Sequence, residues 1–216
     1  MSAYLVEGGN RLQGTARVHG AKNSVLPILA ATILCPGESV VHNCPDLSDV
    51  RASIAILEHL GCRVERAGDT VTVDASALTG RDVPDALMRE MRSSVIFLGA
   101  ILARLGEAIM SFPGGCELGP RPIDLHLAAL RTLGADIREE NGLLQGGELH
   151  CSAAGGLAAC EITFSIPSVG ATENAMLCAC GAEGVTVICN AAREPEIVDL
   201  QAFLRALGAD VRGAGT

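Results

Sequence analysis

The chain has 216 residues, and its formal net charge is −9 at pH 7 because 25 acidic residues outnumber 16 basic ones. With 49% hydrophobic and 19% charged residues, the composition excludes a disordered polymer and predicts a globular protein with a sizeable core. The acidic balance, with four Phe, one Tyr and no Trp, argues against nucleic-acid binding. No apolar stretch is long and charge-free enough to cross a bilayer, so no membrane partner is expected.

The first twenty residues predict a hairpin that stands apart from the rest of the chain. Residues 3–7 and 11–19 have the composition of two strands, and Gly8-Gly9-Asn10 between them is typical of a turn. No helical pattern lies in this segment. Residues 1–20 are therefore interpreted as a separate N-terminal hairpin.

Three helices that are apolar on nearly every face are expected next. They cover residues 24–34, 94–105 and 171–182, and short strands are expected after them at 39–41, 108–111 and 185–188. A helix without a polar face must be buried. These three helices are therefore expected to pack together in the interior.

An amphipathic helix follows each of these strands and completes a repeating pattern. Asp49, Asp124 and Asp199 lie near the starts of these helices at even spacing, and each helix ends in a Leu-Gly turn that leads into a strand. The pattern predicts an α/β fold of three repeats, at about 21–80, 81–155 and 156–216. The alternative is a chance recurrence of common Leu-Gly helix ends. The third repeat stops before a return strand, so the chain is expected to belong to something longer.

The starts of the three apolar helices suggest an anion site. Lys22 precedes Asn23, which is expected to cap the first helix with Pro27 in its first turn, and Arg92 precedes the second helix. Ser168 to Gly170 open the third helix with a hydroxyl and a glycine that lets a ligand approach the backbone. If the helices run parallel, their N-termini form one composite anion site. The alternative for Lys22 is a solvated side chain beside an ordinary cap.

Cys116 differs from the other eight cysteines because it lies in a loop rich in glycine and proline. Arg121 follows it, Pro122 is expected at the first helical position and Asp124 in the first turn of the next helix. A cation and a helix N-terminus favour the thiolate, so Cys116 is a candidate nucleophile or acid, the alternative being an inert exposed thiol.

The remaining cysteines have no ligand or disulfide pattern. The chain has nine cysteines in all, an odd number, no CxxC pair is present, and most lie in apolar runs, so reduced thiols in a cytoplasmic protein are expected. Cys178 and Cys180 would face apart on a helix, and the five histidines have no metal-ligand spacing, so no metal site is expected. His126 is expected at most to support the site from the surface of its helix.

Taken together, these motifs resemble the UDP-N-acetylglucosamine 1-carboxyvinyltransferases, which are enolpyruvyl transferases. The resemblance covers essentially the whole chain. It rests on Gly20-Ala21-Lys22-Asn23, Pro113-Gly114-Gly115-Cys116, residues 119–126, residues 168–172 and residues 190–199.

The resemblance implies a fold and a reaction. The fold is an inside-out α/β barrel of two lobes, each with pseudo-threefold symmetry, βαβαββ repeats and buried parallel helices. The reaction passes the enolpyruvyl group of phosphoenolpyruvate to the 3′-hydroxyl of UDP-N-acetylglucosamine and releases phosphate, as the first committed step of peptidoglycan synthesis. No metal or other cofactor is implied.

The resemblance also implies roles for individual residues. Cys116 would protonate the methylene carbon of phosphoenolpyruvate, and it would be the thiol that fosfomycin alkylates. The residues implied in binding either substrate are Lys22, Asn23, Arg92, Arg121, Pro122, Ile123, Asp124, Leu125, Ser168, Val169 and Gly170. Ile166 stands where some family members have a lysine that touches the sugar nucleotide, so that contact is not assumed.

By resemblance, residues 21–216 form the lobe that carries the catalytic cysteine. The hairpin at 1–20 belongs to a second lobe that this chain does not contain, and the uncovered face favours self-association. Little or no turnover is expected from this chain alone. Two alternatives are a non-catalytic lobe that binds the nucleotide sugar and the enolpyruvyl transferase of the shikimate pathway, against which the Pro113–Cys116 loop argues.

Overall fold

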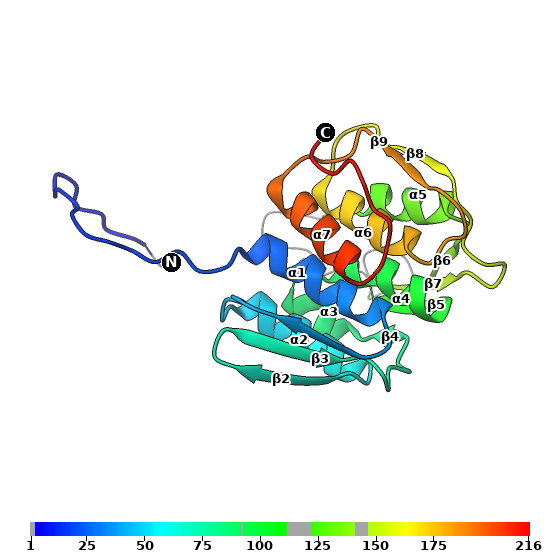
Figure 1. The fold of residues 1–216 in the computed structure, drawn as a ribbon, viewed down its shortest axis with the longest axis horizontal. Helices are drawn as coiled ribbons and strands as arrows, with labels where there is room; N and C mark the ends of the chain where they lie inside the picture. Colours follow the sequence, from blue (N-terminus) through cyan, green and yellow to red (C-terminus); the bar gives the residue numbers. More distant parts are fainter. Residues whose placement is uncertain (1–2, 92, 112–121, 141–146) are drawn as a thin grey trace.

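The computed structural model describes residues 3–91, 93–111, 122–140 and 147–216. It shows an α/β protein in which helices and small sheets alternate along the chain (Figure 1). The described strands form three sheets, with the strand orders β1-β3-β2, β4-β5-β7-β6 and β8-β9. Each sheet belongs to one stretch of the chain, which agrees with the predicted repeat.

The central sheet shows the repeat in its fullest form. Its strands are β4 (Asp82–Val83), β5 (Glu107–Ser111), β6 (Asp136–Glu140) and β7 (Glu148–Ser152). β4 pairs with β5 in parallel, across a connection that includes helix α4 (Phe97–Leu105), and β7 pairs antiparallel with both β5 and β6. With α5 (Asp124–Thr132) between β5 and β6, this stretch has the order βαβαββ.

The other two sheets contain parts of the same pattern. β1 (Glu38–Val41), β2 (Arg63–Ala67) and β3 (Thr70–Asp74) form the first sheet, which has no counterpart of β4. In the last sheet β8 (Glu161–Thr163) pairs in parallel with β9 (Val187–Cys189), and no strand corresponds to β6 or β7 among the residues described. Among the described residues, the βαβαββ unit is therefore complete only in the middle of the chain.

The expected apolar helices are present and form the interior. They are α1 (Lys22–Ala31) with the 3-10 turn η1 (Thr32–Leu34), η2 (Ser94–Ile96) with α4, and α6 (Val169–Ala179). Their fully buried side chains include Leu29, Ile33, Phe97, Ile101 and Leu177. Their burial removes apolar surface from water, which is the main driving force for this fold.

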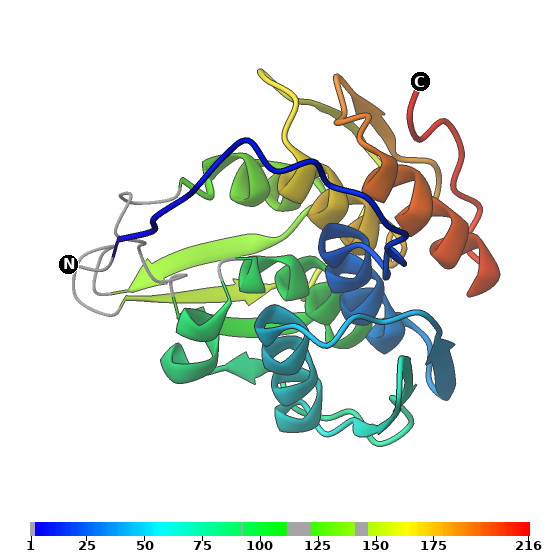
Figure 2. The ribbon, with the colours of Figure 1, turned by 90° about the vertical axis from the view of Figure 1, so that its left-hand side faces the viewer.

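The amphipathic helices lie outside this interior. They are α2 (Ser48–His59), α5 and α7 (Pro195–Ala206), and α3 (Asp85–Glu90) is a short additional helix. In α7 the buried residues Ile197, Leu200 and Leu204 recur at helical spacing, so one face is apolar. Figures 1 and 2 show α7 beside α1 and α6.

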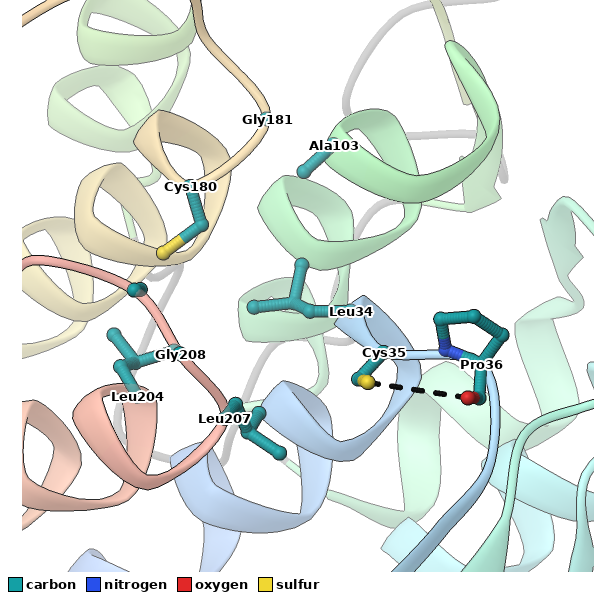
Figure 3. A pocket seen from close by; sticks show the side chains of 10 residues that line it. Leu34, Cys35, Pro36, Ala103, Cys180, Gly181, Leu204, Leu207 and Gly208 are labelled. Carbon is teal, nitrogen blue, oxygen red and sulfur yellow. Dashed lines mark hydrogen bonds between the residues drawn. The ribbon is translucent and has the colours of Figure 1, made fainter.

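The buried helices are parallel, because their C-terminal ends meet at one hollow and their N-terminal ends meet at another. A hollow of about 300 Å³ is lined by Leu34, Ala103 and Cys180, which lie at the C-terminal ends of the three apolar helices, together with the end of α7 (Figure 3). A second hollow, described below, is lined by residues at the N-terminal ends of the same helices. Four helix dipoles therefore point in one direction.

The prediction that the N-terminal segment forms two strands is wrong. Residues 3–19 contain no strand and extend away from the body of the protein (Figure 1). Tyr4, Leu5 and Leu12 are each more than 90% exposed. The segment touches no sheet that could pair with its backbone, and an isolated two-stranded ribbon is marginal in water.

Three further expectations differ from the structure. No strand follows the Leu207-Gly208 turn, because residues 209–216 have no strand beside them with which to pair. Pro27 is the sixth residue of α1, so the Asn23 carbonyl cannot receive the usual helical hydrogen bond from it. Asp199 is the fifth residue of α7, and Glu196 is the acid in its first turn.

Candidate anion-binding site

The N-terminal ends of the buried helices surround a hollow of about 560 Å³. Residues from the starts of five helical segments contribute to its wall, and Asp49 of α2 adds to them. The described lining residues are Lys22, Asn23, Leu26, Pro27, Asp49, Ser93, Val95, Ile96, Pro122, Ile123, His126, Ser168, Val169, Gly170, Glu173 and Glu196. The expected gathering of helix N-termini is thus present, and it brings unpaired N–H groups to one place.

Lys22 and Asn23 lie at the start of α1, and both already have acidic partners. Lys22 Nζ donates to Asp49 Oδ2 at 2.8 Å, and Asn23 Nδ2 donates to Glu196 Oε1 at 3.4 Å. The sequence predicted that Asn23 caps the helix, but the helix begins at Lys22, two residues earlier than expected, and Ala21 occupies the cap position. Lys22 is therefore neither a free cation nor a merely solvated side chain.

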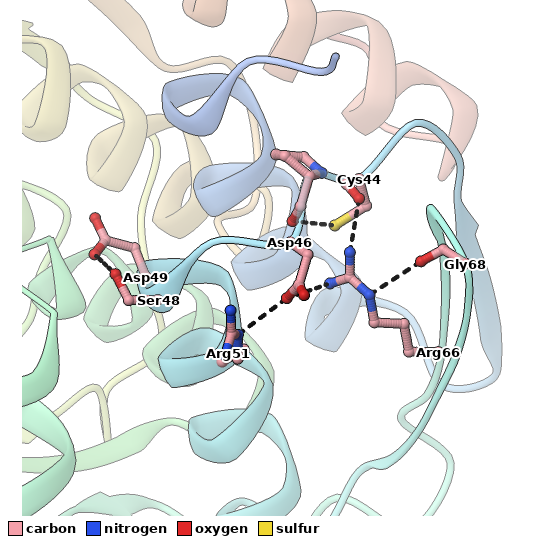
Figure 4. A network of polar contacts seen from close by, with 8 residues as sticks. Cys44, Asp46, Ser48, Asp49, Arg51, Arg66 and Gly68 are labelled. Atoms are coloured by element: carbon pink, nitrogen blue, oxygen red, sulfur yellow. Dashed lines mark hydrogen bonds and ion pairs between the residues drawn. The ribbon is translucent and has the colours of Figure 1, made fainter.

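A network of polar contacts holds the loop that leads into α2, the helix whose first turn carries Asp49 (Figure 4). Arg66 of β2 donates to the Cys44 carbonyl at 2.9 Å and to the Gly68 carbonyl at 3.1 Å. Asp46 accepts a hydrogen bond from Arg51 at 3.0 Å. These contacts tie the loop between β1 and α2 to the edge of the first sheet, and they set the position of the carboxylate that Lys22 meets.

The start of α6 is capped by Ser168, a role that the sequence analysis did not assign to it. Ser168 accepts a hydrogen bond from the Ala171 backbone N–H at 3.4 Å through its hydroxyl oxygen. Gly170 was expected to let a ligand approach the backbone, but its close neighbour in the structure is His126. A Cβ atom at residue 170 would lie 3.0 Å from His126 Cε1. The missing side chain at residue 170 makes room for the imidazole ring.

Asn174 is a structural residue of the site that the sequence reasoning missed. It is fully buried in α6; its Oδ1 accepts from the Gly99 backbone N–H at 2.6 Å, and its Nδ2 donates to the Val95 carbonyl at 2.9 Å. Nδ2 also lies 3.1 Å from His126 Nδ1. Because the Gly99 contact fixes the amide orientation, His126 Nδ1 accepts, and the ring proton of the neutral imidazole is on Nε2. His126 thus belongs to the wall of the hollow.

The residues before α5 divide into two groups. Pro122 and Ile123 line the hollow, whereas Asp124 and Leu125 are not among its described lining residues. Ile123 occupies the cap position of α5, so Pro122 precedes the cap and is not at the first helical position as predicted. Ile166 is 63% exposed and is likewise not among those lining residues.

Glu173 is the second residue that the sequence reasoning missed. It lies in α6, lines the hollow and is only 5% exposed. Burial raises the pKa of its carboxyl group to about 8, and the nearby carboxylates of Glu196 and Glu194 contribute to the same shift. A glutamate in an apolar helix gives little sign in the sequence that its side chain faces a cavity.

Three predicted site residues, Arg92, Cys116 and Arg121, lie outside the described residues. Their roles therefore stay predictions. Among the described cysteines, burial raises the pKa of Cys62 to about 11 and the pKa of both Cys151 and Cys178 to about 12. These three thiols are protonated in the folded protein at neutral pH, as expected for buried cysteines.

Two kinds of feature are absent from the described part of the chain. No group of three or more His, Cys, Asp or Glu side chains there is arranged to hold a metal ion. None of the described helices is both long enough and apolar enough to pass through a bilayer.

Comparison with known proteins gives consistent matches. Residues 6–216 match the EPSP synthase (3-phosphoshikimate 1-carboxyvinyltransferase) family. UDP-N-acetylglucosamine 1-carboxyvinyltransferase 2 of Caldanaerobacter subterraneus subsp. tengcongensis is 53% identical over the whole chain, which covers 50% of that relative. UDP-N-acetylglucosamine 1-carboxyvinyltransferase 1 of Symbiobacterium thermophilum is 54% identical over 98% of the chain and 48% of the relative. The chain thus spans about half the length of the curated relatives it matches.

Solved structures show the same architecture. The enolpyruvyl transferase NikO from Streptomyces tendae aligns with a TM-score of 0.79 and 27% identity over 95% of this chain and 47% of its own. The EPSP synthase from Acinetobacter baumannii aligns with a TM-score of 0.69 and 19% identity, over 94% of this chain and 45% of the length of that protein. At this low identity, the match shows a shared fold and nothing more. The predicted α/β lobe is therefore confirmed.

Proposed function

Because this chain belongs to the EPSP synthase family of enolpyruvyl transferases, we propose that it supplies the cysteine-bearing half of a UDP-N-acetylglucosamine 1-carboxyvinyltransferase. The complete enzyme transfers the enolpyruvyl group of phosphoenolpyruvate to the 3′-hydroxyl of UDP-N-acetylglucosamine and releases phosphate. In this proposal the reaction takes place in the cytoplasm and begins peptidoglycan synthesis. The names of relatives at 53% and 54% identity support this choice of acceptor over shikimate 3-phosphate.

The observation that carries this proposal is the convergence of helix N-termini on one hollow. Both substrates are anionic, since one has a carboxylate and a phosphate and the other a diphosphate. Unpaired N–H groups and aligned helix dipoles stabilise such charges without having to reorganise during the reaction. The hollow of about 560 Å³ is of a size that suits small-molecule ligands.

The proposed chemistry assigns steps to named residues. The Cys116 thiol gives its proton to the methylene carbon of phosphoenolpyruvate, and the sugar hydroxyl oxygen adds to the adjacent carbon while its own proton passes to a carboxylate of the second lobe. The Cys116 thiolate then takes a proton from the new methyl group, and the departure of phosphate with its bonding electrons restores the double bond. Lys22, Arg92 and Arg121 neutralise the carboxylate and phosphate, and Ser168 to Gly170 with Arg121 to Leu125 hold the UDP moiety.

The half-length match supports a second candidate, in which this chain by itself only binds the nucleotide sugar. Family members close two lobes over the substrates to exclude water, and a single lobe lacks that step. We therefore propose little or no turnover by this chain alone. Self-association through the face that a second lobe would cover belongs to the same proposal.

Two assays test these proposals. Phosphate release with both substrates should be near background for this chain alone, and rates typical of a complete enzyme would contradict the two-lobe reasoning. Intact-mass analysis after treatment with fosfomycin and UDP-N-acetylglucosamine should show one adduct at Cys116. Equal labelling of several thiols would show ordinary reactivity and would contradict the role of Cys116.

A further inference from the structure

Glu173 presents a buried carboxyl group to the anion hollow. The residue is 5% exposed, and it lies one turn inside the N-terminus of α6. No other described residue forms a hydrogen bond or ion pair with its carboxyl group. A buried acid without a partner is costly unless a ligand or a proton satisfies it.

The charges around Glu173 are mostly negative. Glu194 and Glu196 face it from the start of α7, and the only described cation in the hollow, Lys22 of α1, is paired with Asp49 of α2. His126 of α5 lines the same hollow, whereas the described lining residues of η2 carry no charge. A further negative charge here is strongly disfavoured, so the Glu173 carboxyl group holds its proton at neutral pH.

We propose that Glu173 is a substrate-binding residue that acts as a neutral carboxylic acid and donates its O–H to an anionic oxygen of the bound ligand. A protonated carboxyl group at a helix N-terminus adds one donor to the backbone N–H groups there. Loss of the proton replaces the donor by a negative charge that repels the same oxygen. Anion binding is therefore switched off as pH rises. This inference rests on the proposed function, because the hollow must receive an anion.

Titration of the ligand at several pH values tests the inference. The probes are UDP-N-acetylglucosamine and sulfate, whose phosphate and sulfate charges do not change between pH 6.5 and 9. A hydrogen bond to a charged group corresponds to about 10-fold or more in affinity. Wild-type affinity should therefore fall at least about 10-fold over that range.

Two variants at residue 173 separate the donor from the charge. Glu173→Gln keeps an N–H donor of similar shape and cannot ionise, so its affinity should match the wild type at pH 6.5 and stay constant to pH 9. Glu173→Leu has no donor, so it should bind about 10-fold more weakly than Glu173→Gln at pH 6.5. Circular dichroism melts establish that each variant is folded. Glu194→Gln is the control at a neighbouring residue. Its affinity for the ligand should still fall as pH rises, but the midpoint of that fall should lie at lower pH than in the wild type, because one charge that repels ionised Glu173 is gone.

The outcomes distinguish this inference from the proposed function. Binding of UDP-N-acetylglucosamine that falls equally in wild type and Glu173→Gln overturns the inference and leaves the proposed function intact. Equal affinities of Glu173→Leu and Glu173→Gln at pH 6.5 also overturn it. Sulfate binding that depends on residue 173, without binding of the nucleotide sugar, supports the inference and contradicts the proposed function.

Discussion

Substituting Gly99 by alanine tests how closely two buried helices approach each other. Gly99 is in α4, where its backbone N–H donates to Asn174 Oδ1 of α6 at 2.6 Å. A Cβ atom at residue 99 would overlap the Asn174 carbonyl oxygen and Oδ1, and it would lie 3.3 Å from the carbonyl carbon. The two helices would have to separate for the methyl group to fit.

Two effects of opposite sign decide the result. Replacing a helical glycine by alanine stabilises a helix by about 1 kcal/mol through backbone entropy. Overpacking a rigid contact between backbones costs about 1–3 kcal/mol, and weakening the Asn174 hydrogen bonds costs about 1–2 kcal/mol more. We therefore expect the free energy of unfolding to fall by about 1–4 kcal/mol.

Urea unfolding measures this change directly. The midpoint should move to lower urea with an unchanged slope, since the surface exposed on unfolding is the same. Gly155→Ala is the control, because no heavy atom lies within 4 Å of a Cβ at that exposed turn position, and it should shift stability by less than about 0.5 kcal/mol. A Gly99→Ala protein as stable as the wild type, or more stable, would refute the close-packing argument.

Three further perturbations follow from the site and the core. Asp49→Asn removes the negative charge that pairs with Lys22, so affinity for sulfate should rise severalfold, while stability changes by less than about 1 kcal/mol because the Lys22 side chain is half exposed. Brief alkylation of the folded protein should leave Cys62, Cys151 and Cys178 unmodified by mass spectrometry, because burial raises the pKa of each thiol. Between pH 5 and 8, the wild type should lose stability relative to Glu173→Gln at up to about 1.4 kcal/mol per pH unit. Unfolding releases a proton from Glu173 in this range, because its pKa is about 8 when folded and lower when unfolded.

Each of these perturbations has a contradicting result. Weaker sulfate binding by Asp49→Asn would show that the carboxylate helps to place Lys22 rather than competing with the ligand. Rapid labelling of any of the three buried thiols in the folded protein would show that the core opens locally. Parallel stability curves for the wild type and Glu173→Gln, from pH 5 to 8, would show that Glu173 ionises normally.

The buried helices could be predicted from the sequence because nearly all of their residues are apolar. The segments around Leu29, Ile101 and Leu177 are apolar at nearly every position, and only an interior location satisfies such a pattern. Their common direction was implied by the resemblance to the transferase family, and the hollow lined by their N-terminal residues agrees with it.

Other features depend on neighbours that the sequence does not display. The alternating residues 3–19 have strand composition, yet a strand forms only where another strand pairs with it. The same reason explains the absence of a strand after Leu207-Gly208. The acidic partners of Lys22 and Asn23 also come from distant segments, so a cationic pattern in the sequence became a site of mixed charge.

Glu173 and Asn174 show why the wall of the site was only partly predicted. They are adjacent in α6, but Glu173 lines the hollow while Asn174 contacts Gly99 of α4. Helical periodicity cannot assign such directions when every face of the helix is covered. The run of three polar residues at 172–174, in a helix whose other residues are apolar or glycine, is the one signal that could have identified them.

The most direct test of the account is to map where UDP-N-acetylglucosamine binds, by two-dimensional amide NMR of the labelled chain. The account predicts shift changes at residues 22–23, 122–126 and 168–173, where the helices begin. Residues 34–36 and 204–209, at the opposite ends of the helices, should not change. Changes concentrated at those opposite ends, or no changes at millimolar ligand, would contradict the claim that the gathered helix N-termini bind the nucleotide sugar.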